Sequence, residues 1–249
     1  PSRAAFRRQV MGRRLGPVQR LGKRIILPLC DGQSVVIEPR MTGLVLLADP
    51  PDREHLRLGL LLEGGPAPWL GFWDRRGLGT LAVLNKQDFA DRFGPQKLGP
   101  DALAVTAAEL RQRQSACNRE IKVALLDQGL LAGIGNLNSS EILHVAGLHP
   151  QTRCRRLARG QWQRLHDAVR QVLLEAIQYE GSTLSDGTYP NALNRVGRYQ
   201  SHHRVYARDG QTCRRCHQGT VRRIVQGQRS TFFCPRCQRK TLTGRSSVG

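Results

Sequence analysis

Four cysteines near the C-terminal end restrict the fold of this chain more than any other feature. Cys213 and Cys216 form one Cys-x2-Cys pair, Cys234 and Cys237 form a second, and seventeen residues separate the pairs. Each pair places two thiolates on one tight turn, and two such turns complete a tetrahedron of sulfur ligands around one zinc ion. Four sulfurs leave no open coordination position, so we expect a structural Zn²⁺ that supplies much of the folding energy of a short module.

The residues between the pairs predict a β-hairpin. Thr220–Gln226 and Ser230–Phe233 have the composition of strands, and Gly227-Gln228-Arg229 is expected at the tip. His217 lies beside Cys216, but four cysteines already complete the coordination sphere. We therefore expect His217 to be an exposed polar residue.

Three further cysteines are scattered along the chain at Cys30, Cys117 and Cys154, which makes seven in all. A secreted disulfide scaffold is usually shorter and more evenly studded with cysteine. We expect these three to be small buried hydrophobes without chemistry.

Nothing in the sequence predicts insertion into a membrane or secretion. No apolar stretch reaches the length of about 18 residues that a transmembrane helix needs. The first residues carry no apolar segment followed by a small-residue cleavage site. We expect a cytoplasmic protein with no membrane partner.

Positive charge is concentrated at the two ends of the chain, and the formal net charge is +20. Residues 1–24 contain eight basic residues and no acidic one, and residues 195–240 contain twelve Lys or Arg against the single acid Asp209. Two separated basic stretches suit a polyanion held from two sides, and nucleic acid is the expected partner. On charge alone, a ribosomal or other RNA-binding surface is the alternative.

The first hundred residues predict a β-rich domain. Asp31-Gly32 has the composition of a hairpin turn between two apolar strands. The expected strands are Ile25–Cys30, Val35–Glu38, Gly43–Leu47, Leu56–Leu62, Trp69–Trp73 and Thr80–Leu84. Short strands at this spacing favour a sandwich or barrel, and one short helix is expected at Arg3–Val10.

The pattern becomes helical after Leu98-Gly99-Pro100. Thr106 and Glu109 have the spacing of a capping box, and Gly147 is placed to end a helix. Further helices are expected near Arg119–Gln128, near Asn138–Ala146 and along an amphipathic stretch from Trp162 to Ile177. Residues 181–206 predict a loop and linker, and the tail after Leu242 is expected to be disordered.

Several stretches of the chain closely resemble one protein family. The matching segments are Ile121–Gln128, Leu131–Asn136, Ser140–Leu143, Ala146–Pro150, Gly181–Leu184, Val205–Arg208 and Gln228–Gln238. The chain resembles the formamidopyrimidine-DNA glycosylase / endonuclease VIII family of base-excision repair enzymes over most of its length, from Arg13 to Lys240.

The resemblance implies a multi-domain α+β protein whose DNA lies in a cleft between domains. Residues 1–102 would be a β-sandwich catalytic domain, 103–206 a helix-two-turns-helix domain, 207–241 a zinc finger and 242–249 a tail. The implied partner is double-stranded damaged DNA, and we expect a monomer.

The resemblance also implies a reaction. Members of the family flip a damaged base out of the helix, because its glycosidic carbon is unreachable inside a duplex. A secondary amine attacks that carbon and forms a Schiff base, and elimination then breaks the strand. The expected activity is therefore a DNA glycosylase with AP lyase activity that removes oxidised bases of the formamidopyrimidine or 8-oxoguanine type.

Three residues of the β-rich half match functional positions of the family. Lys23 matches a lysine that contacts DNA and assists proton transfer, although a solvated lysine at a strand start is the plain alternative. Met41 matches a methionine that fills the space left by the flipped base, with a core position as the alternative. Arg76 matches the arginine that pairs with the orphaned base, but Gly77 and Leu78 replace the family's arginine and phenylalanine, which leaves lesion preference open.

Four further matches concern phosphate binding. Arg53 falls where many members have a phosphate-binding histidine, and His55 follows two residues later. Asn136, in a Gly-Ile-Gly-Asn turn, would bind a phosphate at a helix N-terminus, or act as a simple N-cap. Lys122 would contact the same DNA strand as Asn136. Arg229 matches the zinc-finger arginine that binds phosphate near the lesion and helps the second elimination.

The N-terminus departs from the family. Members begin with Pro-Glu-Leu-Pro-Glu, whose proline amine is the nucleophile and whose first glutamate is the acid. This chain begins Pro1-Ser2-Arg3, and only twenty-two residues precede Lys23. We expect that roughly thirty residues, including the catalytic Pro-Glu, precede the chain as given.

Two alternatives to an active glycosylase stay open. The first is a non-catalytic damaged-DNA-binding protein or an inactive fragment, because no Pro-Glu is present. The second is a ribosomal or transcriptional zinc ribbon, which the helical centre and the segments around Met41 and Arg76 disfavour.

Overall fold

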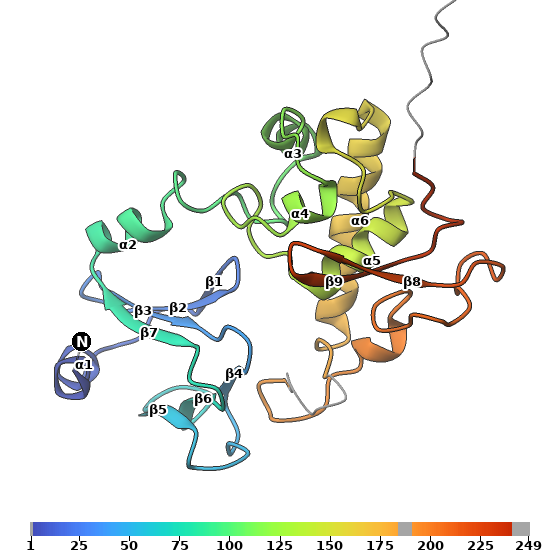
Figure 1. Ribbon diagram of the computed structural model, residues 1–249. Helices are drawn as coiled ribbons and strands as arrows, with labels where there is room; N and C mark the ends of the chain where they lie inside the picture. Colours follow the sequence, from blue (N-terminus) through green and yellow to red (C-terminus); the bar gives the residue numbers. More distant parts are fainter. Residues whose placement is uncertain (1, 184–190, 241–249) are drawn as a thin grey trace, which may run out of the picture. The chain divides into compact units, whose positions relative to one another are not determined.

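The computed structural model describes residues 2–183 and 191–240 (Figure 1). Pro1, residues 184–190 of the expected loop, and residues 241–249, which include the expected tail, lie outside the described residues. The chain forms two compact units, one made of Pro1–Leu98 with Ala176–Ser201 and the other of Gly99–Glu175 with His202–Gly249.

The first unit contains two antiparallel sheets. The strands are β1 (Gln19–Leu21), β2 (Arg24–Pro28), β3 (Ser34–Glu38), β4 (Gly43–Leu46), β5 (Leu56–Leu61), β6 (Trp69–Asp74) and β7 (Thr80–Leu84). One sheet has the order β1-β2-β3-β7 and the other β4-β6-β5. All six expected strands are confirmed, and β1 is an addition that its polar sequence Gln-Arg-Leu did not predict.

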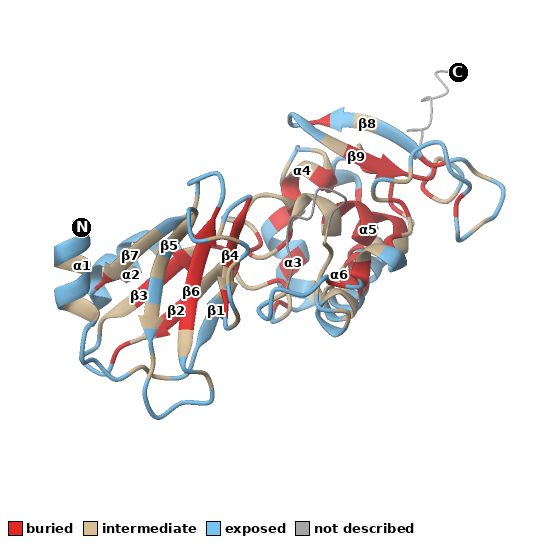
Figure 2. Cartoon of the chain, turned by 90° about the horizontal axis from the view of Figure 1, so that it is seen from below, coloured by how far each residue is buried: buried red, intermediate tan, exposed pale blue. Residues whose placement is uncertain are grey.

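The two sheets face each other across an apolar core, which confirms the sandwich. Leu27 and Ile37 of the four-stranded sheet pack with Leu70 and Phe72 of β6. These side chains are buried because strands place alternate residues on the inner face, and Figure 2 shows the buried stretches of β3 and β6. The predicted helix α1 (Arg3–Val10) adds Phe6 to the edge of this core.

The outer face of the four-stranded sheet is covered by a second short helix, α2 (Lys86–Phe93). Its Phe89 and Phe93 pack on a separate buried cluster that includes Val36 and Leu84. Asn85 caps the helix by accepting the Asp88 backbone N–H at 2.8 Å. Two aromatic residues four positions apart are too short a pattern to have predicted this helix.

The second unit is built around four α-helices. They are α3 (Ala107–Gln114), α4 (Ile121–Leu125), α5 (Asn136–Ala146) and α6 (Arg159–Gln178). The 3-10 turn η1 (Cys154–Arg156) lies between α5 and α6, and the last residues of α6, from Ala176, belong to the first unit. The Thr106–Glu109 capping box is confirmed, and Gly147 ends α5 with a φ of 67°. The helix expected near Arg119–Gln128 is shorter than predicted, because the backbone turns at Asp127 and Gly129.

The C-terminal module of this unit is a hairpin of β8 (Arg222–Gln226) and β9 (Arg229–Phe233), preceded by the 3-10 turn η2 (Tyr199–His202). The hairpin is confirmed, but its tip is only Gly227-Gln228, both with positive φ (52° and 60°). Arg229 is therefore the first residue of β9 and pairs with Gln226, which corrects the prediction that it belongs to the tip. Among the described residues, no helix has both the length and the apolar character to cross a membrane.

Candidate functional site

The four cysteines of the second unit converge on one point. The Cys213–Cys237 and Cys216–Cys234 sulfur pairs are both separated by 3.8 Å, and all four sulfurs lie within 4.8 Å of one another. A tetrahedral site with Zn–S bonds of about 2.3 Å places its sulfurs about 3.8 Å apart. The donor set and spacing fit a structural zinc, as the sequence predicted.

The ionisation of the cluster requires a cation. Burial, and then hydrogen bonds with the other sulfurs, raise the pKa of the Cys237 thiol far above its ordinary value. In contrast, backbone hydrogen bonds, that of Gln218 first, lower the pKa of Cys216 to about 6. Four thiolates this close repel one another, so all four are ionised together only when a divalent ion neutralises them. Gly219 leaves room for the sulfurs, because a Cβ there would lie 2.7 Å from the Cys234 sulfur.

Cys213 receives hydrogen bonds from outside the cysteine pairs. The Arg215 backbone N–H points to its sulfur at 3.4 Å, and His144 of α5 lies 3.4 Å from it through Nε2. Burial, and then the charge of Arg215, lower the pKa of His144 to about 4, so the ring is neutral. A zinc-bound thiolate only accepts hydrogen bonds, so Nε2 carries the proton and donates it. His217 is exposed, as expected.

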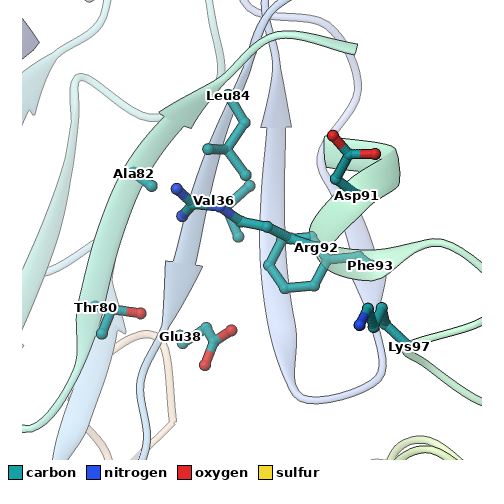
Figure 3. Close-up of a pocket in the computed structure, with 9 residues that line it drawn as sticks. All are labelled: Val36, Glu38, Thr80, Ala82, Leu84, Asp91, Arg92, Phe93 and Lys97. Carbon is teal, nitrogen blue, oxygen red and sulfur yellow. The ribbon is translucent and has the colours of Figure 1, made fainter. Parts of the chain in front are cut away.

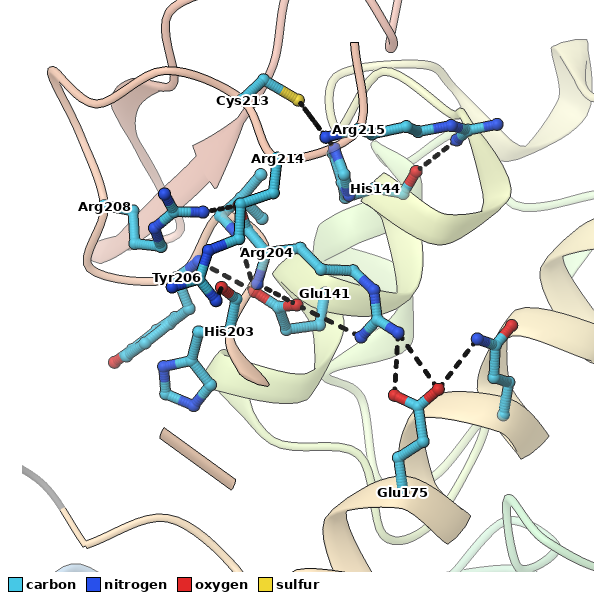
Figure 4. A network of polar contacts seen from close by, with 12 residues as sticks. Glu141, His144, Glu175, His203, Arg204, Tyr206, Arg208, Cys213, Arg214 and Arg215 are labelled. Atoms are coloured by element: carbon cyan, nitrogen blue, oxygen red, sulfur yellow. Dashed lines mark hydrogen bonds and ion pairs between the residues drawn. The ribbon is translucent and has the colours of Figure 1, made fainter. Parts of the chain in front are cut away.

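A buried carboxylate attaches the start of the zinc module to α5 (Figure 4). Glu141 is fully buried and accepts three backbone N–H groups, from Arg204, Val205 and Tyr206, at 2.8–2.9 Å. The Arg204 guanidinium lies 3.8 Å from the same carboxylate and also pairs with Glu175 at 2.9 Å. Because every oxygen of Glu141 is used, the segment entering the module has one fixed position on the helix.

Three of the residues expected to bind phosphate form one cluster in this unit. Lys122 of α4 donates from Nζ to Asn136 Oδ1 at 2.6 Å, and Asn136 Nδ2 donates to the Ser230 carbonyl of β9 at 3.1 Å. Arg229, next to Ser230, is exposed. Burial, and then the charge of Arg229, lower the pKa of Lys122 to about 8.

This cluster has the electrostatics of an anion site. It brings Lys122 and Arg229 together against their mutual repulsion. Asn136 is the first residue of α5, and the N-cap, Gly135, makes no side-chain capping bond. Unbonded N–H groups at a helix start and two nearby cations favour an anion such as phosphate. The Asn136 side chain is engaged with Lys122 and β9, so the N-cap alternative does not describe it.

In the first unit, a buried aspartate joins two loops that the sequence singled out. Asp74 accepts the Thr42 hydroxyl at 2.6 Å and the Gly79 N–H at 2.7 Å. Thr42 in turn accepts the Arg76 backbone N–H at 3.1 Å. The segment carrying Met41 and the segment carrying Arg76 are thereby linked. Thr42 and Asp74 were not predicted as site residues, although both stand inside the motifs around Met41 and Arg76.

The predicted contact residues of these loops point to solvent. Met41 is 54% exposed, which excludes the core position that was its alternative, and Arg76 is exposed. Lys23 is exposed in the two-residue turn Gly22-Lys23 between β1 and β2, where Gly22 has a φ of 58°. Met41 and Arg76 are therefore accessible from solvent.

Arg53 lies in a separate, ordered turn. Asp52 accepts both the backbone N–H and the ring Nδ1 of His55 at 2.9 Å, and the Trp73 indole N–H at 3.1 Å. These bonds, the backbone one first, lower the pKa of Asp52. The turn leaves Arg53 exposed, whereas His55 is half-buried against Trp73.

A further pocket of the first unit contains none of the predicted residues. It has a volume of about 350 Å³ and lies between the outer face of β3 and β7 and the end of α2 (Figure 3). Val36 and Phe93 form its apolar wall, and Glu38 and Lys97 lie at its border. Glu38 forms ion pairs with Arg24 and Arg40, so its carboxylate is already neutralised within the protein.

Comparisons with known proteins place this geometry in a family. The formamidopyrimidine-DNA glycosylase N-terminal domain matches residues 1–81, its H2TH domain matches 98–188, and a zinc finger found in FPG and IleRS matches 210–239. The formamidopyrimidine-DNA glycosylase of Chloroflexus aurantiacus is 40% identical over 243 residues, which cover 96% of this chain and 84% of the relative. The chain belongs to the formamidopyrimidine-DNA glycosylase family. Its members are DNA glycosylases and AP lyases of base-excision repair.

Solved structures of the family have the same fold. The MutM (Fpg) protein from Thermus thermophilus has a TM-score of 0.80 and 37% identity, covering 91% of this chain and 84% of that one. A complex of Lactococcus lactis Fpg with DNA containing an abasic site has a TM-score of 0.82 and 28% identity, covering 95% and 86%. The predicted combination of an N-terminal β-sandwich, a helical domain and a zinc finger is confirmed.

Proposed function

We propose that this chain binds double-stranded damaged DNA and acts as a base-excision-repair glycosylase with AP lyase activity on oxidised bases. The observation that carries the proposal is the cluster of Lys122, Asn136 and Arg229. It assembles two cations and a helix start where a DNA phosphate would neutralise them. Family relatives with DNA in their structures support the same partner.

The exposed loops of the first unit supply the second part of the proposal. Met41 would enter the duplex where the damaged base is flipped out, and Arg76 would hold the orphaned base. Unstacking costs a few kcal/mol, roughly, and an apolar wedge offsets part of this. Arg53 would contact a phosphate. Lys23 would contact DNA and assist proton transfer during catalysis.

Arg229 carries two proposed roles, phosphate binding and assistance to the second elimination. It lies beside Ser230, whose carbonyl is tied to Asn136, so its backbone is fixed while its side chain is free to reach a phosphate. Arg229→Ala should weaken DNA binding and lower the slope of log K against log[salt] by about one unit. Arg222→Ala, an exposed arginine of the same hairpin, is the control for general charge loss. Equal slopes in both variants would contradict a specific contact.

Borohydride trapping tests the activity. The protein is incubated with duplex DNA that contains 8-oxoguanine or an abasic site, and the Schiff base is reduced to a stable amine. A covalent adduct with both duplexes supports a working glycosylase and lyase.

The same experiment separates the second candidate. Tight binding to abasic DNA without any adduct would identify a non-catalytic damage-binding protein. Equal affinity for intact and abasic duplexes would contradict damage recognition altogether. The monomeric state is tested by sedimentation of the free protein and of its DNA complex.

A further inference from the structure

Two cysteines outside the zinc site lie on neighbouring segments of the second unit. Cys117 and Cys154 are 37 positions apart in sequence. The Cys154 N–H donates to the Arg119 carbonyl at 3.0 Å, and the Arg155 N–H donates to the Cys117 carbonyl at 3.2 Å. The two side chains are also close enough for each to affect the pKa of the other. The fold therefore brings the two cysteines together. Cys154 is buried as expected, whereas Cys117 is half-buried and Cys30 is exposed, which corrects the expectation that all three are buried.

The surroundings of Cys117 favour a thiolate. Its sulfur accepts the Nε–H of Arg119 at 3.3 Å and the Arg119 backbone N–H at 3.4 Å. Asp127 holds the other side of the guanidinium at 2.9 Å, so Arg119 is fixed beside the sulfur. Burial alone would raise the pKa of Cys117, but the hydrogen bonds and charge of Arg119 outweigh it and lower the pKa below its ordinary value. The residue is half-buried and therefore accessible.

Cys154 has the opposite character. It is fully buried at the start of η1, and burial raises the pKa of its thiol to about 12. It therefore holds its proton more tightly than Cys117 does. An accessible sulfur that a cation stabilises as a thiolate, next to a second thiol, is the arrangement that reacts with oxidants and then closes a disulfide.

We propose that Cys117 and Cys154 are a modification site for hydroperoxides. The Cys117 sulfur attacks one oxygen of hydrogen peroxide, the O–O bond breaks, and hydroxide leaves and is protonated to water. Sulfur is oxidised by two electrons to a sulfenic acid. The Cys154 sulfur then attacks the Cys117 sulfur, an S–S bond forms, and the hydroxyl leaves with the Cys154 proton as a second water. Two thiols and one peroxide give one disulfide and two waters.

The position of this pair gives the modification a consequence. Cys117 precedes α4, the helix that carries Lys122, by four residues. Between them, Glu120 accepts a hydrogen bond from Gln226 of β8 at 2.6 Å. A disulfide between Cys117 and Cys154 would restrain residues 117–122 and hence the cluster of Lys122, Asn136 and Arg229. This consequence rests on the proposed DNA-binding function, whereas the thiol chemistry does not.

The test uses the zinc-loaded full chain and hydrogen peroxide. After brief oxidation, free thiols are alkylated, and the protein is digested and analysed by mass spectrometry without reduction. We expect a peptide linked through Cys117 and Cys154, with zinc retained. In Cys154→Ser, we expect dimedone to capture a sulfenic acid on Cys117 about fivefold faster than on the exposed Cys30. Equal capture at Cys30, or zinc release before any linkage, would overturn the proposal.

A second pair of variants isolates the role of the cation. Arg119→Gln removes the guanidinium and should slow alkylation of Cys117 by iodoacetamide about fivefold at pH 7. Arg113→Gln, an exposed arginine of α3, is the matched control and should leave the rate unchanged. An unchanged rate in Arg119→Gln would also overturn the proposal. Comparing oxidised and reduced protein for DNA affinity then tests the consequence alone, so a failure there leaves the thiol result standing.

Discussion

The two units hold their predicted DNA contacts in different ways. In the second unit, Lys122, Asn136 and the strand carrying Arg229 are bonded to one another before any ligand arrives. In the first unit, Met41 and Arg76 are exposed, and only the backbone beneath them is fixed, by Thr42 and Asp74. A phosphate has one shape in every DNA, so a preformed cluster suits it. A damaged base pair must be distorted, so side chains that adapt after contact suit it better.

The largest effect on this difference between the units is expected from a change at the zinc site. Cys234→Ser removes one of four ligands, and structural zinc in small modules is worth about 10–16 kcal/mol in apparent binding free energy. We expect the zinc content to fall from one per chain to near zero and the preformed cluster to be lost, because β9 holds Asn136 through Ser230. Metal analysis and DNA titration measure both effects.

The first unit should survive this change. Its core is formed by the two sheets, and its strand β6 carries Trp69 and Trp73. Their fluorescence is expected to stay native-like in Cys234→Ser, and Cys30→Ser is the control for loss of a cysteine elsewhere. Loss of the fluorescence signal together with the zinc would mean that the two units do not fold separately.

The next largest effect is expected from Glu141→Gln. The amide replaces one acceptor oxygen with a donor, which then faces backbone N–H groups of residues 204–206. Leaving buried donors unsatisfied should lower the free energy of unfolding of the second unit by about 3 kcal/mol. Urea denaturation measures this.

Glu175→Gln is the matched control, since it also removes a partner of Arg204 but from a part-exposed pair. Its cost should be below about 1 kcal/mol. Similar losses in the two variants would mean that the backbone contacts of Glu141 are not what fixes the zinc module.

Asp74→Asn tests the buried carboxylate of the first unit, as Glu141→Gln tests that of the second. It weakens the links to Thr42 and Gly79, at a cost of about 1–3 kcal/mol. The loops carrying Met41 and Arg76 then lose their common support, and the preference for abasic over intact duplex should fall severalfold. Asp31→Asn, an exposed aspartate paired with Arg13, is the control. Zinc content should not change in Asp74→Asn. A loss of zinc would mean that the contacts of the first unit and the zinc site of the second unit are not independent.

The smallest expected effect is a pH dependence that belongs to Lys122. Its pKa in the free protein is about 8, and a bound phosphate raises it, so binding takes up a proton as the pH rises through 8. Affinity for DNA should therefore fall between pH 7 and pH 9, by up to about tenfold per pH unit. Lys122→Met should weaken binding at pH 7 and remove this component of the pH dependence. A variant that keeps the full dependence would exclude Lys122 as its source.

The same shift affects stability with the opposite trend. A lysine whose pKa is lowered from 10.5 in the folded state opposes folding while it is charged, at pH values below about 8. The free energy of unfolding should therefore rise as the pH increases from about 8 toward 10.5, and Lys122→Met should not show this rise.

Much of the fold could be predicted because local signals agree with the tertiary structure. The Asp31-Gly32 turn, the Thr106–Glu109 capping box and Gly147 each specify a conformation by themselves. The missed elements lack such signals. β1 has only three residues, of which Leu21 alone is apolar, and α2 is a mainly polar helix of eight residues.

The candidate site was predictable as a set of residues and not as an arrangement. Cys-x2-Cys spacing is a local property, so the zinc ligands follow from the sequence. The bond from Asn136 to Ser230 joins residues 94 positions apart, and the depth of Lys122 depends on that packing. Cys117 and Cys154 looked isolated for the same reason. The roles of Lys23, Met41, Arg53 and Arg76 stay predictions.

Helix α5 contacts both the Lys122–Asn136–Arg229 cluster and the zinc ligands of its unit. Its first residue, Asn136, belongs to the proposed anion site, and His144, eight residues later, lies 3.4 Å from the sulfur of the zinc ligand Cys213. At about 1.5 Å per residue, the two points are roughly 12 Å apart on one rigid rod. We expect metal binding and phosphate binding to be coupled through this helix, and such coupling is reciprocal. Any free energy that the bound metal adds to DNA binding is then the same free energy that bound DNA adds to metal binding.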